Sequence, residues 1–248
     1  MASTNWKENT PPFKFTHNPS LEPFNVDSST FCHNAEEDLI GIVVGALVFH
    51  RKKLVNSPSP STSDTSSTSN SEHQEPQDEE EKDHILIIQR ARTDSHPLLW
   101  EIPGGAVDYD DPSPLYAVAR ELWEESGLIL SHVRREVSIG GKGFPTTRDE
   151  KGYVLFTSRG CRVAKYSFEA DVPPVEAVGN GGDGKEGHMV TLDHEEHEQY
   201  LWVTKEEVEA SQCVRNGNPI KFRMTSKEQR KTILQGFKLR EEDRRKEE

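Results

Sequence analysis

The chain has 248 residues, of which 32% are apolar and 29% are charged, a lean composition for a fully packed protein of this length. Segments that are poor in apolar residues cannot offset the entropy lost on ordering, so part of the chain should lie outside any core. The formal net charge of −13 excludes the broad attraction to phosphate backbones on which binders of long nucleic acids depend.

The cysteine pattern and the hydropathy of the chain indicate its compartment. Cys32, Cys161 and Cys213 are odd in number, lie far apart and form no C-x-x-C pair, so neither a disulfide framework nor a zinc site is indicated. No apolar run approaches the roughly 20 residues that span a bilayer, and residues 1–24 lack the apolar core of a secretory signal. We expect an intracellular, cytoplasmic protein without a membrane partner.

In the first third of the chain we expect an extension, two strands and an insert. Residues 1–37 mix Pro, Asn, Ser and Thr with scattered Phe and show no period, which indicates a partly disordered extension that packs in part. Residues 39–50 (LIGIVVGALVFH) and 84–90 (HILIIQR) are typical of strands. Between them, residues 57–84 contain eight acids against one lysine and have the composition of a disordered insert in a continuous domain.

After residue 150 the sequence predicts a hairpin, a strand and a helix. Residues 153–159 and 162–168 have strand character and flank Gly160, whereas residues 173–187 have a loop composition before a strand at 199–203. Residues 225–248 favour a charged helix that frays into solvent. This mixed order indicates an α+β or sandwiched α/β domain over residues 38–210, followed by a helical, charged segment at 211–248.

Residues 100–128, WEIPGGAVDYDDPSPLYAVARELWEESGL, carry the chemistry. Ser113 is suited to cap a helix that starts at Pro114, and Gly127 stands where a left-handed residue usually ends one, so we predict a helix over 114–126. Its apolar residues form a stripe that should face a sheet: Leu115, Val118, Ala119 and Leu122.

Glu121, Glu124 and Glu125 lie at positions i, i+3 and i+4, so their carboxylates share one face of this helix. Such a cluster repels itself unless a cation lies in it. Hard carboxylate oxygens suit Mg²⁺ or Mn²⁺ better than zinc. Gly104 and Gly105 bring bare backbone to the same end of the unit, where a carbonyl can complete the coordination and amides can meet phosphate oxygens.

This stretch resembles the Nudix box, G-x5-E-x7-R-E-u-x-E-E-x-G-u, in which u is apolar. Residues 120–128 (RELWEESGL) match its second half at every specified position, but Asp111 replaces the first Glu and lies one residue too far from Arg120. The resemblance implies a Nudix-type α/β/α sandwich with a mixed β-sheet. It also implies metal ligands at Gly104, Glu121, Glu124 and Glu125, with Arg120 orienting a glutamate.

The implied activity is hydrolysis, with Mg²⁺ or Mn²⁺, of the pyrophosphate bond in a nucleoside diphosphate linked to a group X. The partner would be a small nucleotide derivative. The resemblance leaves open the identity of X, the glutamate that acts as base, and whether a late-loop acid (Glu195, Glu196 or Glu198) adds a ligand. The alternative is a catalytically silent domain that binds a nucleotide metabolite or a protein.

Two weaker patterns are better explained without function. Residues 179–186 (GNGGDGKE) approach a phosphate-binding loop, but Glu186 replaces the hydroxyl residue that would hold Mg²⁺. His194 and His197 lack the spacing of a helical zinc pair. We further expect Trp100 and Trp202 to be core or turn residues, and Arg90 and Arg92 to be solvated arginines at a strand end.

Overall fold

The computed structural model describes residues 13–34, 39–53, 81–139, 153–156, 160, 162–173 and 189–247. The expected loop at 173–187 and the phosphate-loop pattern at 179–186 therefore lie almost wholly outside the described residues. The helices and strands, in chain order, are β1 (Thr16–His17), the 3-10 helix η2 (Pro19–Phe24), α1 (Ser28–Asn34), β2 (Leu39–Lys53), β3 (Glu81–Arg90), β4 (Trp100–Glu101), α2 (Pro114–Ser126), β5 (His132–Glu136), β6 (Tyr153–Phe156), β7 (Arg162–Asp171), β8 (His197–Val203), α3 (Lys205–Ala210), β9 (Gln212–Arg215), β10 (Asn218–Lys221) and α4 (Lys227–Glu247).

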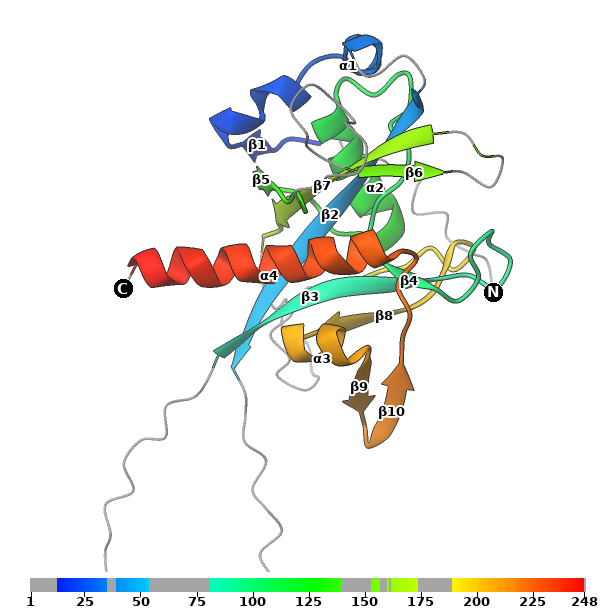
Figure 1. The fold of residues 1–248 in the computed structure, drawn as a ribbon, viewed down its shortest axis with the longest axis vertical. Coiled ribbons are helices and arrows are strands. Elements are labelled where there is room, and N and C mark those ends of the chain that lie inside the picture. Colours follow the sequence, from blue (N-terminus) through cyan, green and yellow to red (C-terminus); the bar gives the residue numbers. More distant parts are fainter. Residues whose placement is uncertain are drawn as a thin grey trace, which may run out of the picture.

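Strand β2 joins the two halves of a mixed sheet (Figure 1). Its first part, residues 39–48, pairs in parallel with β7, and its last part, residues 49–53, pairs antiparallel with β3. The strand order is β1-β5-β7-β2-β3-β4, with β6 added to β7 and β8 added to β3. The expected α+β architecture with a mixed sheet is confirmed.

The alternation of side chains along β3 explains how helices cover both faces of the sheet. Residues 85–88 are all fully buried. Leu86 and Ile88 pack in one core with the apolar stripe of α2, whereas Ile85 and Ile87 pack in a second core with α4. Because successive side chains of a strand point to opposite faces, a continuous apolar run such as ILII at residues 85–88 suits a strand that is covered on both sides. The structure is thus an α/β/α arrangement.

Most expected elements are present, with shifted ends. The hairpin is confirmed, since β6 pairs antiparallel with β7 and Gly160 between them has a φ of 75°. β3 starts at Glu81 rather than at residue 84, so the last residues of the expected insert belong to a strand, and residues 54–80 lie outside the described part. The sequence analysis did not predict β1, η2, α1, β5, α3, β9 or β10.

The N-terminal segment contributes directly to the core. Leu21 and Phe24 are 2% and 4% exposed. The Phe24 ring packs on Tyr166 and Phe168 of β7, with ring centroids 5.2 and 5.1 Å apart. Phe24 and Phe31 therefore cover the β7 half of the sheet, while residues 1–12 and 35–38 lie outside the described part.

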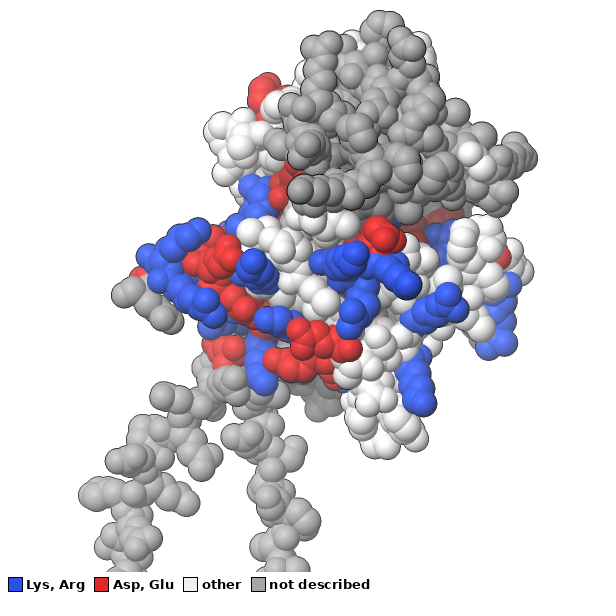
Figure 2. Space-filling view, viewed as in Figure 1, with Lys and Arg blue, Asp and Glu red and all other residues white. Residues whose placement is uncertain are grey.

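The expectation that the C-terminal helix frays into solvent is wrong. Helix α4 crosses the sheet and buries Ile233 and Phe237. Acidic and basic side chains interleave along its C-terminal half (Figure 2). Arg240 donates to Glu169 at 2.6 Å and to Asp83 at 3.2 Å, so the charge of this arginine is paired with acids of the sheet. Within the described residues, no helix is long and apolar enough to cross a membrane.

Candidate functional site

Helix α2 has the ends that its sequence predicts. It spans Pro114–Ser126; the Ser113 side chain accepts a hydrogen bond from the backbone N–H of Tyr116, and Gly127 adopts a left-handed φ of 67°. The apolar stripe is at most 1% exposed at all four positions. It attaches the helix to β2, and this attachment directs the opposite face towards the glycine loop, residues 103–107.

The glycine loop is fixed to the edge of β2 by backbone hydrogen bonds. The N–H of Val44 donates to the carbonyl of Gly105 at 2.9 Å, and the N–H of Ala46 donates to that of Pro103 at 2.8 Å. Between them, the Gly104 carbonyl accepts no hydrogen bond from a described residue. Gly104 has a φ of 152°, and a Cβ there would lie 2.2 Å from the Val44 carbonyl oxygen, so only glycine fits.

Arg120 holds the acidic face of α2 together. Its guanidinium donates to both oxygens of Asp111, at 3.0 and 2.8 Å, and to Glu121 and Glu124 at 2.8 and 3.0 Å. It also donates to the Ala106 carbonyl of the glycine loop at 2.9 Å. The cation that this cluster requires is therefore supplied in part by the chain itself, and Arg120 orients two glutamates rather than one.

Asp111 makes its contact with Arg120 despite the altered spacing of the motif. The backbone N–H of Asp111 donates to the Asp108 carbonyl at 3.2 Å, and the N–H of Asp108 donates to the Asp111 carboxylate at 2.7 Å. These bonds close a compact turn that accommodates the extra residue. The Asp111 side chain is only 3% exposed, and its short carboxylate reaches the arginine in a two-pronged contact.

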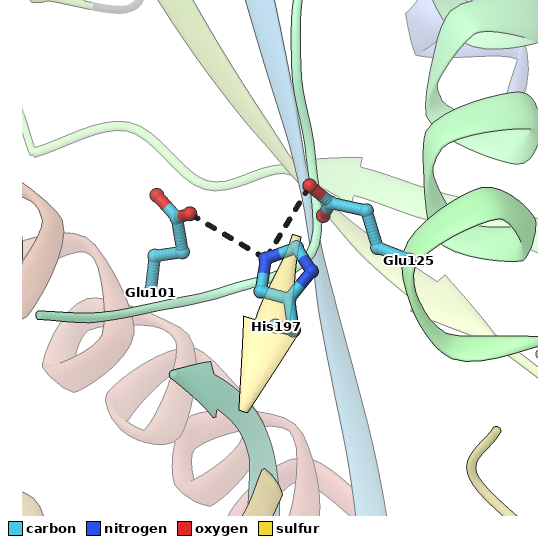
Figure 3. A group of neighbouring side chains, drawn as sticks. All are labelled: Glu101, Glu125 and His197. Carbon is cyan, nitrogen blue, oxygen red and sulfur yellow. Dashed lines mark ion pairs between the residues drawn. The ribbon is translucent and has the colours of Figure 1, made fainter. Parts of the chain in front are cut away.

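Glu125 turns away from Arg120 towards a second group of side chains. It accepts a hydrogen bond from the N–H of Gly104 at 2.6 Å. Its other oxygen lies 3.6 Å from Nε2 of His197, and the same nitrogen lies 3.8 Å from a Glu101 oxygen (Figure 3). The sequence predicted no role for Glu101, and the spacing of His197 from His194 indicated no zinc pair. In the sequence, Glu101 is marked only by its position before IPGG, and His197 only by its position inside HEEHE.

Burial makes these carboxylates favour a proton or a cation. It raises the pKa of Glu121 to about 7, although Arg120 opposes the shift. It also raises the pKa of Glu125, with a further contribution from the negative charges of Glu101 and Glu121. Lys165 of β7 is buried near them, and burial lowers the pKa of its ammonium while Glu101 and Glu125 raise it.

The residues around these carboxylates differ in their burial and in their contacts. Arg90 is not simply solvated, because it forms ion pairs with Glu101 and, at 2.6 Å, with Asp94. His194 is exposed, whereas His197 is buried. Trp100 is in the core, as expected.

The three late-loop acids are all exposed. Glu196 raises the pKa of Glu125 electrostatically, whereas Glu198 accepts a hydrogen bond from the backbone N–H of Arg92 at 3.3 Å. Of the three, Glu196 thus has the clearest connection to the α2 carboxylates.

Together these residues fit a divalent cation. On the acidic face of α2, burial disfavours Glu121 and Glu125 as bare anions, and the glycine loop provides a backbone carbonyl without a described partner. Oxygen donors of this kind suit Mg²⁺ and Mn²⁺.

Comparison with known proteins gives a family match. The sequence profile described as "NUDIX domain" matches residues 77–222. A search of curated proteins found no match.

Among solved structures, the chain is similar to a MutT protein from Methanosarcina mazei Go1, with 18% identity over 83% of this chain and 98% of that one and a TM-score of 0.44. It is also similar to a MutT NUDIX hydrolase from Burkholderia pseudomallei, with 15% identity, 79% and 96% coverage and a TM-score of 0.41. A mutT/nudix family protein from Listeria innocua has 19% identity, 83% and 96% coverage and a TM-score of 0.42.

Proposed function

Because the chain belongs to the NUDIX domain family, we propose that it hydrolyses the pyrophosphate bond of a nucleoside diphosphate linked to a second group X. The products would be a nucleoside monophosphate and phosphorylated X. One observation carries the proposal: the acidic face of α2 and the glycine loop converge around Arg120 in the arrangement that the family's motif implies.

The proposed metal ligands are the Gly104 carbonyl and the carboxylates of Glu121, Glu124 and Glu125. When bound, Mg²⁺ or Mn²⁺ offsets the charge that develops on phosphoryl oxygens and lowers the pKa of a coordinated water. The carboxylates that would hold the metal are already oriented, since Arg120 positions two of them and the N–H of Gly104 positions the third. This preorganisation avoids the cost of rearranging charged side chains during the reaction.

Positive charge near the site supports binding of a pyrophosphate. The negative charge of Glu101 raises the pKa of both Lys165 and Arg90, so both cations lie close enough to interact electrostatically with the acidic group. A substrate with several negative charges brings anionic oxygens towards a group of carboxylates, so fixed cations beside the metal lower the repulsion. The chain's overall charge of −13 makes such local cations more important for this step.

The proposal is tested by a hydrolysis panel with the full chain in Mg²⁺ and Mn²⁺. The panel contains ADP-ribose, dinucleoside polyphosphates, coenzyme A, nucleotide sugars and oxidised nucleotides, and chromatography resolves the products. We expect turnover of one class, lost by at least about a hundredfold in Glu124→Gln and Glu125→Gln. Glu209→Gln is the matched control, because Glu209 is an exposed glutamate on α3. Full turnover in both α2 variants would refute the mechanism.

One argument for a silent domain is the altered first half of the motif, in which Asp111 replaces a glutamate. The structure weakens that argument, since Asp111 makes the two-pronged contact with Arg120. Calorimetric binding of a nucleotide without turnover at saturating Mg²⁺ and Mn²⁺ would restore the silent-domain hypothesis.

A further inference from the structure

Three buried side chains from different elements meet beside the glycine loop. They are Glu101 of β4, Glu125 of α2 and His197 of β8, and Figure 3 shows the imidazole lying between the two carboxylates. Each offers a ligand atom, and these three atoms lie within 4.8 Å of one another. The residues are 4%, 6% and 2% exposed, so bulk water solvates none of them well.

The contacts of His197 are too long for a hydrogen-bonded ion triad. Its Nε2 lies 3.6 Å from Glu125 and 3.8 Å from Glu101, whereas a charge-assisted hydrogen bond would be about 2.7–2.9 Å long. Ligand atoms that surround one ion at about 2.0–2.2 Å lie roughly 3–4 Å from each other. The observed spacing therefore matches a shared cation better than a shared proton.

The imidazole also lacks other partners. Nδ1 is buried without a hydrogen bond, and Nε2 makes no hydrogen bond to any residue that the structure describes. A buried ring nitrogen without a donor or acceptor, such as this Nδ1, is unusual, because its desolvation is not compensated. The ring is therefore not held in place by a hydrogen bond of its own among the described residues, and its Nε2 faces the two carboxylates at 3.6 and 3.8 Å.

We propose that Glu101, Glu125 and His197 form a metal position with one nitrogen and two oxygen ligands, which binds Mn²⁺ in preference to Mg²⁺. Imidazole nitrogen is a good ligand for first-row transition ions and a poor one for Mg²⁺. Arg90 orients Glu101 through their ion pair, as outer partners of metal ligands commonly do. The inference rests on the proposed function only in that both use Glu125.

Nitrogen ligation can be read out without measuring activity. The full chain is stripped with a chelator and loaded with one equivalent of Mn²⁺, and electron spin-echo spectroscopy then detects ¹⁴N coupling to the ion. We expect coupling in the wild type and in His194→Gln, and its loss in His197→Gln. His194 is the matched control, because it is an exposed histidine in the turn that precedes β8, three residues before His197. Absent coupling in the wild type, or coupling that persists in His197→Gln, overturns the proposal.

A second measurement covers the case in which His197→Gln does not fold. Glu101→Gln keeps the size of the side chain and should lower the Mn²⁺ affinity at least about tenfold while leaving the Mg²⁺ affinity unchanged. Equal losses for both ions would overturn the proposal. This test and the test of the proposed function can fail separately. Nitrogen coupling in a wild-type protein that shows no turnover refutes only hydrolysis. Wild-type turnover that is lost in Glu124→Gln, with no nitrogen coupling in the wild type, refutes only this metal position.

Discussion

Replacing Asp111 with Asn tests whether this short acid takes the place of the glutamate in the family's motif. The change removes the negative charge that receives two bonds from Arg120, at 3.0 and 2.8 Å, and one from the N–H of Asp108 at 2.7 Å. The Asp111 side chain is 3% exposed, so water cannot replace these bonds. Breaking a buried ion pair on one side costs about 3–5 kcal/mol.

We expect the lower end of that range, about 3 kcal/mol, for Asp111→Asn. Arg120 is itself 15% exposed and keeps Glu121 and Glu124 as partners, so its charge is not left uncompensated. The assay is urea unfolding of the full chain, with equal slopes required for the comparison. Asp110→Asn is the control, because it removes the same charge from the adjacent, exposed position and should change the unfolding free energy by less than about 0.5 kcal/mol. Equal stability of the two variants would refute the role assigned to Asp111.

Two further predictions concern Glu121 and the glycine loop. Since burial raises the pKa of Glu121 to about 7 from 4.5, its contribution to the stability of the metal-free protein is fully present below about pH 4.5 and is lost as the pH rises through 7. We therefore expect the unfolding free energy in chelator to fall by up to about 3 kcal/mol between pH 5 and pH 8, and to fall less in Glu121→Gln; a wild-type stability that rises over this interval would contradict the assignment. In Gly105→Ala, the new Cβ would lie 2.6 Å from the Glu121 carboxyl group that Arg120 holds, so calorimetry should show an Mn²⁺ affinity at least about tenfold lower. Gly41→Ala meets no atom within 4 Å and should bind normally; equal affinities in the two variants would show that the loop does not set the position of Glu121.

Local features of the sequence predicted helix α2 and its acidic face well. The cap at Ser113, the proline that follows it and the left-handed Gly127 all act within one or two turns, so their effect can be deduced without a fold. The spacing of the three glutamates likewise depends only on the helical repeat.

The long-range parts of the site required the structure. Glu101 and His197 are 96 positions apart in the chain, yet both contact the group around Glu125, because β3 pairs with β4 on one edge and with β8 on the other. No local pattern specifies which strands become neighbours. The spacing between His194 and His197 therefore says nothing about His197, whose neighbours in space are Glu101 and Glu125.

The sequence by itself determined the composition of the motif, the ends of α2 and the strand character of the segments that form the mixed sheet. Only the tertiary structure decided that Asp111 reaches Arg120 across a one-residue insertion, that the N-terminal Phe24 belongs to the core, and that α4 packs on the sheet instead of fraying. The physical reason is the same in each case. Periodicity and capping energies act between residues a few positions apart, whereas burial, ion pairing and strand order depend on contacts between segments that only folding brings together.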